Sequence, residues 1–409
     1  MKQVRSLIYI CILLLCLLPL ACGTDGDAAP AAPAETPAGS AAADEPDGDV
    51  VALFTPAPTE PNTPAPTEAP TEAPTEAPTP TPVPEISLHV EEPTDVEALS
   101  ALIETSGNVE SVEIDSGMID NEDLAAVFAR FPNVTFRYSV KFGDGYVSSD
   151  AGELDLSKKK IKDVDELNRL FDLLPNLKRV EMIDCGLDNA TMAGICDAHP
   201  EIRFIWEIDL GYWGKLRTDA TAFSTRSNKT PIQVQNKLKS AKETDRVQYI
   251  RYCTDLVALD LGHQSLTDIS FVRPLKKLRV LILADNYVSD ISVLAELSEL
   301  EYLELFMNRV SDLSPLANLP KLRDLNIRAN KVSDFRPLCS IKTLERVWYA
   351  ANDYKSSDHK MLEEALPNCI LNHTSKDATS EGWRFDEKGN KVESYKWMLA
   401  FFEGAPRYD

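Results

Sequence analysis

The sequence LRVLILADNYVSDISVLAELSE occupies residues 278–299, and the next 22 residues, LEYLELFMNRVSDLSPLANLPK (300–321), repeat its pattern. Leucines at positions 256, 278, 300, 322 and 344 open five copies of L-x-x-L-x-L-x-x-N-x-[VIL]-x-D-[IL]-x-x-L without a gap, the fifth matching through Asn352. A unit this short cannot bury its apolar face alone, so neighbouring copies must stack. The pattern predicts a solenoid in which each copy adds one short parallel strand.

Each recurring position of the 22-residue pattern has a physical role. The Leu-x-Leu pair alternates toward the interior, as a half-buried strand requires. The asparagine after each strand is expected to point inward and to bond backbone groups that no strand reaches; these residues are Asn286, Asn308, Asn330 and Asn352, with Gln264 in the first copy. The aspartates further along are predicted to cap turns or helices, with a calcium-binding column as the alternative; they are Asp268, Asp290, Asp312 and Asp334.

This pattern is the leucine-rich repeat, and its Ser-Asp or Thr-Asp step followed by Pro-Leu resembles the 22-residue class found in internalins. The resemblance covers residues 256–352 strongly. It implies an α/β solenoid with a curved parallel sheet on the concave side and helices and short turns on the convex side. It also implies protein recognition as the habit of the family, without naming a partner.

A longer repeat precedes the 22-residue copies. Residues 85–144 align without gaps onto 153–212, an offset of 68, and fifteen of sixty positions are identical. Each half is predicted to hold a strand, a helix and a second strand; the expected ranges are 109–114, 121–130 and 134–142, and then 177–183, 189–198 and 202–210. Asp120 and Asp188 stand where a helix N-cap belongs. We interpret 86–212 as degenerate, longer leucine-rich units.

Two ranges fall outside these repeats. Residues 213–255 break the repeat pattern and are predicted to form an irregular insertion or junction, polar and turn-rich over 216–235 and compatible with a helix and a strand over 234–252. A solenoid needs its last open edge covered, so residues 353–409 are predicted to form a C-terminal cap in which Trp383 and the amphipathic stretch 395–402 supply aromatic bulk. The order helix, Leu-Pro-Asn-Cys, strand, Gly-Trp-Arg resembles the ending of leucine-rich lipoproteins from Gram-positive gut anaerobes.

The first 22 residues read as a signal peptide. Lys2 and Arg5 precede an apolar run that is too short for a membrane span and contains Pro19. The ending Leu20-Ala21-Cys22 resembles the lipobox of bacterial lipoproteins, although the position three before the cysteine is proline. The resemblance implies a lipidated Cys22 and an extracytoplasmic, membrane-anchored protein exposed at the cell surface. A plain cleavage site or an uncleaved anchor is the alternative.

Residues 23–85 are predicted to be a disordered linker. They contain twelve acidic residues, no Lys or Arg, and 15 of the 27 prolines, so they lack the apolar surface that would offset the entropy of folding. The expected role is a spacer between membrane and solenoid; a ligand for a polyproline-binding partner is the alternative. The whole chain carries 65 acidic and 42 basic side chains, a net charge of −23, which argues against nucleic acid as a partner.

No chemistry-bearing motif appears in the sequence. The five cysteines after Cys22 have no metal-ligand spacing, and no pattern of a nucleophile with its base, of a phosphate loop or of a dinucleotide site occurs. We therefore predict no catalytic residues, no metal and no cofactor. Cys196 aligns with Phe128 of the sister repeat and is expected in the core, with a Cys185–Cys196 disulfide as the alternative.

Strand side chains that point away from the core should line the concave face. Large apolar side chains there, rimmed by charge, often mark an interaction site. The ligand-binding residues predicted on this basis are Ile282, Asp285, Tyr302, Glu304, Phe306, Met307, Arg328 and Trp348. The alternative is that the cap or the 213–255 segment folds over these rings and makes them core.

The expected function is therefore that of a surface-anchored, non-catalytic, monomeric binding protein that presents its solenoid to a protein or a glycan. The alternative is a structural, envelope-organising lipoprotein that self-associates or packs on cell-wall polymer.

Overall fold

The computed structural model describes residues 84–226 and 245–404, all of which belong to one compact unit of the chain. Cys22, the predicted signal peptide and the predicted linker as far as residue 83 lie outside the described residues, as do 227–244 and 405–409. No helix within the described ranges is long and apolar enough to cross a membrane.

The first long unit is a three-stranded parallel sheet with two helices. Its strands are β1 (Ile86–Val90), β2 (Val109–Ile114) and β3 (Thr135–Arg137), joined by α2 (Val96–Ser106) and α3 (Asn121–Arg130). The carboxylate of Asp95 accepts a hydrogen bond from the Ala98 backbone at 2.8 Å and so caps α2. An antiparallel hairpin of β4 (Ser139–Phe142) and β5 (Gly145–Ser148) follows.

The second long unit repeats this order. It consists of β6 (Glu153–Asp155), α4 (Val164–Asp172), β7 (Arg179–Glu181), α5 (Asn189–Ala198) and β8 (Arg203–Ile205), and it ends in the antiparallel pair β9 (Glu207–Asp209) and β10 (Lys215–Arg217), which η1 (Gly211–Trp213) connects. The helices predicted over 121–130 and 189–198 have these bounds in the structure.

One hydrogen-bonded pair shows the 68-residue duplication directly. The Asn121 amide exchanges two hydrogen bonds with the backbone of Lys141, at 2.9 and 3.0 Å. Asn189, 68 positions later, does the same with Asp209 at 2.9 Å. In each unit an asparagine at the start of a helix therefore fixes the strand that follows the parallel sheet.

The second strand expected in each long unit is split. The chain leaves the parallel sheet at Tyr138 in the first unit and at Trp206 in the second, and then begins an antiparallel pair. Both side chains are buried, and the Tyr138 hydroxyl donates to the Leu173 backbone oxygen at 2.7 Å. In each unit, a buried aromatic side chain therefore stands where the expected strand divides in two.

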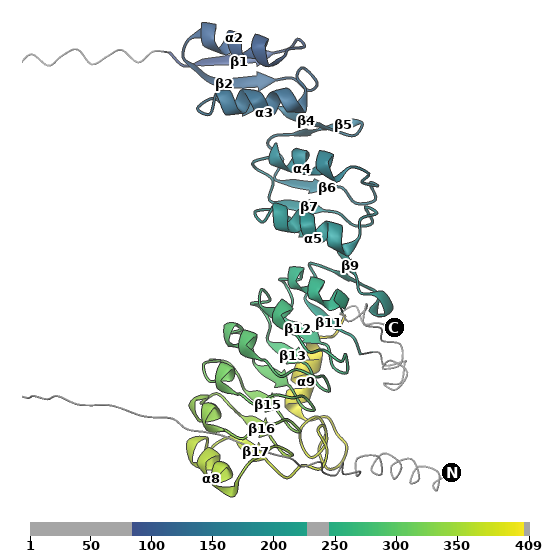
Figure 1. Cartoon of the computed structure of the whole chain (residues 1–409), viewed down its shortest axis with the longest axis vertical. Helices are drawn as coiled ribbons and strands as arrows, with labels where there is room; N and C mark the ends of the chain where they lie inside the picture. Colours follow the sequence, from purple (N-terminus) through teal and green to yellow (C-terminus); the bar gives the residue numbers. More distant parts are fainter. Residues whose placement is uncertain (1–83, 227–244, 405–409) are drawn as a thin grey trace, which may run out of the picture. The chain divides into compact units, whose positions relative to one another are not determined.

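The 22-residue repeats build the largest sheet. It is parallel, in the order β11 (Ala222–Ser224), β12 (Ala258–Asp260), β13 (Val280–Ile282), β14 (Tyr302–Glu304), β15 (Asp324–Asn326), β16 (Arg346–Trp348) and β17 (Ile370–Asn372). Between successive strands the chain returns through short 3-10 helices: η2 (Val247–Tyr252), η3 (Ser270–Val272), η4 (Ser292–Glu296), η5 (Ser314–Leu316) and η6 (Arg336–Ser340). In Figure 1 these helices lie along one side of the strands, and α9 (Glu393–Ala400) lies on the other. The predicted solenoid is confirmed.

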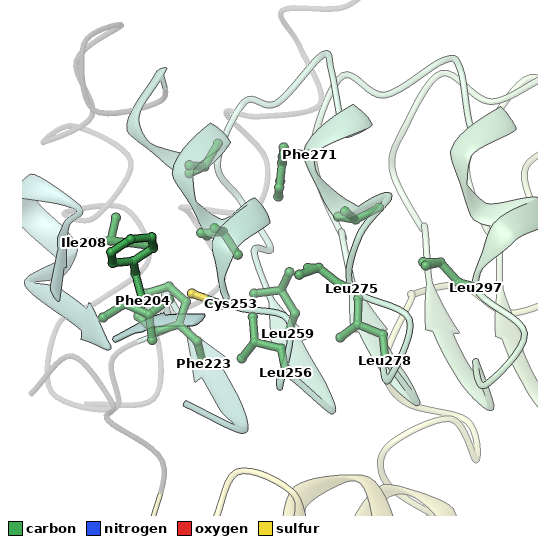
Figure 2. Packing of buried hydrophobic residues seen from close by; sticks show 14 of the residues in the cluster. Phe204, Ile208, Phe223, Cys253, Leu256, Leu259, Phe271, Leu275, Leu278 and Leu297 are labelled. Carbon is green, nitrogen blue, oxygen red and sulfur yellow. The ribbon is translucent and has the colours of Figure 1, made fainter. Parts of the chain in front are cut away.

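The sheet extends beyond the five predicted repeats at both ends. β11 lies in the range expected to be an irregular junction and pairs in register with β12, Phe223 opposite Leu259. β17 lies in the range expected to be cap and pairs with β16; α8 (Ser356–Ala365) precedes it. Figure 2 shows why the core does not end at residue 256: Phe204, Phe223 and Cys253 line up with Leu256 and Leu259 in one row of buried side chains.

The asparagines form the expected ladder between repeats. The side-chain amide of Asn308 donates to the backbone oxygens of Leu283 (2.8 Å) and Leu305 (3.0 Å), and its oxygen accepts from Val288 (3.0 Å). Asn286, Asn330 and Asn352 make the equivalent contacts. In the first repeat Gln264 donates instead to Thr225 and to Gly262. The aspartates accept from the backbone two residues later and so begin the 3-10 helices.

Candidate functional site

Both faces of the 22-residue sheet are covered over five strands. In β12 to β16 all three residues of each strand are buried, whereas a strand with one wet face would alternate. The middle residues, such as Leu281 and Leu303, join the main core, and their neighbours form a second cluster with side chains of residues 378–402. The C-terminal segment therefore packs on the face that we expected to be open.

Trp383 is the centre of this covering segment. Its indole is fully buried and lies 5.4 Å from the Tyr302 ring and 5.3 Å from the Trp348 ring, measured between centroids. Tyr395, Met398 and Phe402, on α9 and just after it, are buried in the same cluster. Burying aromatic rings of this size is a large apolar gain, so this contact holds the cap to the sheet.

A buried ion pair fixes the position of the cap. The Glu304 carboxylate accepts hydrogen bonds from the Arg384 guanidinium, from the Trp383 indole at 2.8 Å and from the Tyr302 hydroxyl at 2.5 Å. Desolvation opposes the charge on Glu304, but Arg384 and the other donors outweigh it and hold the pKa of Glu304 below its ordinary value. Burial raises the pKa of Tyr302 well above its ordinary value, so this hydroxyl stays protonated and donates.

A second buried pair lies one strand further. The Arg346 guanidinium donates to Asp324 at 2.6 Å and to the backbone oxygens of Gly382 (2.9 Å) and Trp383 (3.0 Å). Here desolvation prevails over the attraction of Arg346 and raises the pKa of Asp324. Carboxylates on two strands thus hold the same short segment of the cap, one directly and one through an arginine.

At the side of the sheet where the strands begin, the cap helix packs against arginines. The Arg279 guanidinium lies over the rings of Phe401 (4.9 Å) and Trp397 (5.5 Å), and Arg323 lies over Trp397 (5.4 Å). Glu301 pairs with Arg279 at 2.5 Å. These cation–π contacts help to keep α9 against the repeats.

The prediction that the aromatic patch is exposed was wrong, and its alternative, that the cap covers the rings, describes the structure. The predicted ligand residues that the cap buries are Ile282, Tyr302, Glu304, Phe306 and Trp348. Arg328 is half-buried and donates to the backbone of Ser375 (3.3 Å) and Lys376 (2.8 Å), so it too holds the cap. The physical reason is that these rings find a partner in Trp383 and α9.

The remaining two predicted residues, Asp285 and Met307, lie on a surface that stays accessible. We call it the loop surface and define it as His263, Asp285, Tyr287, Met307 and Arg309, which follow strands β12 to β14. The side chains of Tyr287 and Met307 are each 47% exposed. Arg309 lies over the Tyr287 ring at 4.4 Å, and His263 Nδ1 is 2.7 Å from an Asp285 carboxylate oxygen.

The backbone of the loop surface is held in a sharp turn. His263, Asp285 and Met307 have φ angles of 62°, 53° and 56°, in the left-handed region that side chains seldom adopt. Each backbone N–H donates to the next repeat, as from Asp285 to the Phe306 oxygen at 2.9 Å. The residue that follows each turn (Gln264, Asn286 or Asn308) completes this frame through its side-chain amide, so the exposed side chains stand on a preorganised backbone.

The described ranges contain no cluster of side chains suited to a metal ion and no disulfide. No group of three or more His, Cys, Asp or Glu side chains within 84–226 and 245–404 could hold a metal ion. The five described cysteines are free thiols, so the alternative of a Cys185–Cys196 disulfide is not formed, and Cys185 instead donates to the Leu156 oxygen at 3.1 Å. Cys196 is partly buried against the core, so its expected core position is confirmed only in part, and burial raises the pKa of its thiol to about 12.

Sequence reasoning placed Trp383 in the cap but missed Arg384, and it named two of the five loop-surface residues, Asp285 and Met307. Arg384 carried no signal beyond its place beside Trp383. Tyr287 and Arg309 directly follow the ladder asparagines, and comparing that position across the repeats would have found them. Glu304 was expected to face a ligand and instead faces Arg384.

Comparison with known proteins supports the repeat assignment. Residues 298–340 match a family model described as "Leucine Rich repeats (2 copies)", which confirms leucine-rich repeats there. Similar solved structures include an internalin C2 from Listeria monocytogenes (23% identity, 57% of this chain, 88% of that chain, TM-score 0.31) and an internalin F of the same species (18%, 71%, 81%, 0.30). A leucine-rich repeat protein of Leptospira interrogans is 14% identical, with 65% of this chain and 90% of that chain covered and a TM-score of 0.29. No curated protein sequence matches the chain.

Proposed function

We propose that this leucine-rich repeat chain is a non-catalytic binding protein that is tethered to the cell membrane through a lipidated Cys22 and recognises a protein partner through its loop surface. The lipobox-like Leu20-Ala21-Cys22 supports the tether, since two acyl chains hold a protein on a bilayer stably. The Pro/Thr/Glu-rich residues 23–85 would space the repeats from the membrane.

The observation that carries the proposal is the exposure of Tyr287 and Met307 on turns of fixed geometry. Aromatic and arginine side chains dominate the energetics of measured interfaces, and Met adapts to irregular partner surfaces. Here Tyr287 stacks with Arg309, and both stand one residue after a ladder asparagine. A partner would meet side chains whose backbone is already ordered, which lowers the entropic cost of binding.

Charge favours a protein over a uniformly charged polymer. Asp285 carries a negative charge, and Arg309 and the exposed Lys331, which holds the same position in the next repeat, carry positive charges near the two apolar side chains. An apolar centre with a mixed polar rim is the usual anatomy of a protein interface. A glycan, which would stack on Tyr287 alone, is the competing ligand.

Photo-crosslinking on intact cells tests the proposal. A benzophenone amino acid replaces Tyr287 in one variant and Tyr146 in another; the two tyrosines are 47% and 48% exposed, so they are matched in accessibility. We expect a specific crosslinked protein at position 287 and none at 146. Met307→Ala and Arg309→Ala should each weaken that crosslink without changing the melting temperature.

Other outcomes identify other functions. Equal crosslinking at both positions, or none at 287, would contradict recognition through the loop surface. A crosslink to a second copy of this chain would favour the structural alternative. One observation supports that alternative: Ile370 is 58% exposed on β17, the last strand of the sheet, so end-to-end association would bury it. Sedimentation of the purified chain distinguishes monomer from self-assembly.

A further inference from the structure

The cap does not close the whole face of the sheet. Beside the first strands it leaves a pocket of about 420 Å³, whose sheet wall includes Ser224, Asp260 and Ile282 and whose cap wall includes Arg384, Tyr395 and Phe402. This volume lies within the range of small-molecule sites. The pocket shares no residue with the loop surface, so a ligand bound in it would be independent of the proposed function.

Asp260 is the unusual group in this pocket. It is 7% exposed, and its two carboxylate oxygens accept hydrogen bonds from the Gly262 N–H (3.0 Å) and the Ser224 hydroxyl (3.1 Å). Both donors are neutral. Within the part of the chain that the structure describes, no Lys, Arg or His forms an ion pair with it.

The other two buried acids on this face of the sheet each have a positively charged partner. Glu304 is paired with Arg384 and Asp324 with Arg346, as expected because a buried charge needs a counter-charge. Asp260 is the third buried acid of the described residues. Its carboxylate lines a pocket, whereas each of the other two carboxylates is paired with an arginine guanidinium.

The other residues that line the pocket indicate what kind of ligand would bring a positive charge to Asp260. Ile282, Met398 and Phe402 give apolar walls, while the basic Arg226 and Lys391 are exposed at the margin. Basic side chains there disfavour a polycation. The acids in the lining, Asp260 and the exposed Glu403, give too few ligands for a metal ion, and no cluster of three or more potential ligands is found among the described residues.

We propose that this pocket binds a primary ammonium group attached to an apolar body, with Asp260 as the counter-ion. A free amino acid with a large apolar side chain and the amino terminus of a peptide share this chemistry. The ammonium would donate to the Asp260 carboxylate as a charge-assisted hydrogen bond, and the apolar body would lie against Ile282 and Phe402.

The test is titration calorimetry of the full chain with phenylalanine amide and with N-acetyl-phenylalanine amide, which differ at the amine alone. We expect the free amine to bind and the acetylated compound not to bind. Asp260→Asn should weaken the free amine roughly tenfold or more, since a hydrogen bond to a charged group is lost. Asp353→Asn, an exposed acid outside the pocket, is the matched control and should leave binding unchanged.

Two further titrations distinguish a peptide amino terminus from a free amino acid as the source of the amine. Tighter binding of the peptide Phe-Gly-Gly than of phenylalanine indicates a peptide terminus, and the reverse order indicates a free amino acid; either order supports an ammonium site. Equal binding of the acetylated compound, unchanged affinity in Asp260→Asn, or no binding of any amine would overturn the proposal. Because the acetylated pair needs no variant, the test stands even where a substitution disturbs folding.

Discussion

The guanidinium of Arg384 pairs at two points with the carboxylate of Glu304, which lies 80 positions earlier in the chain, and both side chains are buried. The pair sits between the repeats and the cap, with Tyr302 and Trp383 bonded to the same carboxylate. Since each charge is desolvated, each depends on the other, and the fit between cap and sheet depends on both.

Removing one charge of this pair should destabilise the protein strongly. We expect Glu304→Ala to lower the free energy of unfolding by about 3–5 kcal/mol, because Arg384 is left buried without a partner. Denaturant titration followed by tryptophan fluorescence measures this. The matched control is Glu364→Ala, an exposed acid paired with Lys360 at 3.8 Å, which should change little. The double variant Glu304→Gln, Arg384→Met should be more stable than Glu304→Ala; similar losses in both acid variants would contradict the assignment.

Acid should loosen the cap through Glu304. Its folded pKa is lowered below the ordinary 4.5, so the stability it contributes is fully present above about pH 4.5 and is lost as the pH falls below that value toward the folded pKa. Asp324, whose pKa is raised, acts in the opposite direction. The readout is therefore the difference in melting temperature between the natural chain and Glu304→Gln, which should shrink between pH 6 and pH 3 (roughly the carboxyl range). A constant difference would refute the role of Glu304.

The asparagine ladder should contribute to stability at each repeat. Asn308→Ala would leave the backbone oxygens of Leu283 and Leu305 and the N–H of Val288 without these hydrogen bonds. Unsatisfied buried groups cost about 1–3 kcal/mol each, so we expect a loss of at least about 2 kcal/mol by chemical denaturation. Asn133→Ala, the same substitution at an exposed turn, serves as the control. An equal, small effect at both positions would show that water replaces the ladder.

Cys22→Ser should release the protein from the membrane. If Cys22 is lipidated, the natural chain partitions into the detergent phase of a Triton X-114 extract and the variant into the aqueous phase, because acyl chains supply the membrane affinity. Immunoblotting of the two phases reads this out, and Cys196→Ser, a change at a cysteine of the repeats, should leave the partitioning unaltered. Detergent partitioning of the Cys22 variant would point to an uncleaved anchor instead.

The repeats were predictable because their signal is periodic. Leucines at intervals of 22 place inward residues, and the same spacing located the ladder asparagines and the aspartates of the turns. The 68-residue duplication likewise gave the bounds of α3 and α5. These features depend on contacts between neighbouring repeats. Such contacts require the same residue types at the same spacing, which the sequence shows directly.

The covered face was not predictable in the same way. Tyr302 and Trp348 follow the strand alternation that marks a side chain as pointing outward, and that inference was correct for the strand itself. What covers them, Trp383, comes from a segment with no repeat to align it. Alternation states the direction of a side chain and leaves open whether a distant segment packs there. β11 was missed for a related reason, since it does not begin with the leucine pattern, and the strand expected after Leu-Pro-Asn-Cys forms as β17 but joins the repeat sheet.

Because Trp383 and Arg384 lie 79 and 80 positions after Glu304 of β14, the ribosome makes β14 well before the residues that cover it. During that interval the rings of Tyr302 and Phe306 have no cover, and bare apolar surface on a nascent chain invites aggregation. A stop codon or a protease cut shortly before residue 383 would make that transient state permanent, so quality control in the cell should act hardest on molecules that end between β14 and Trp383.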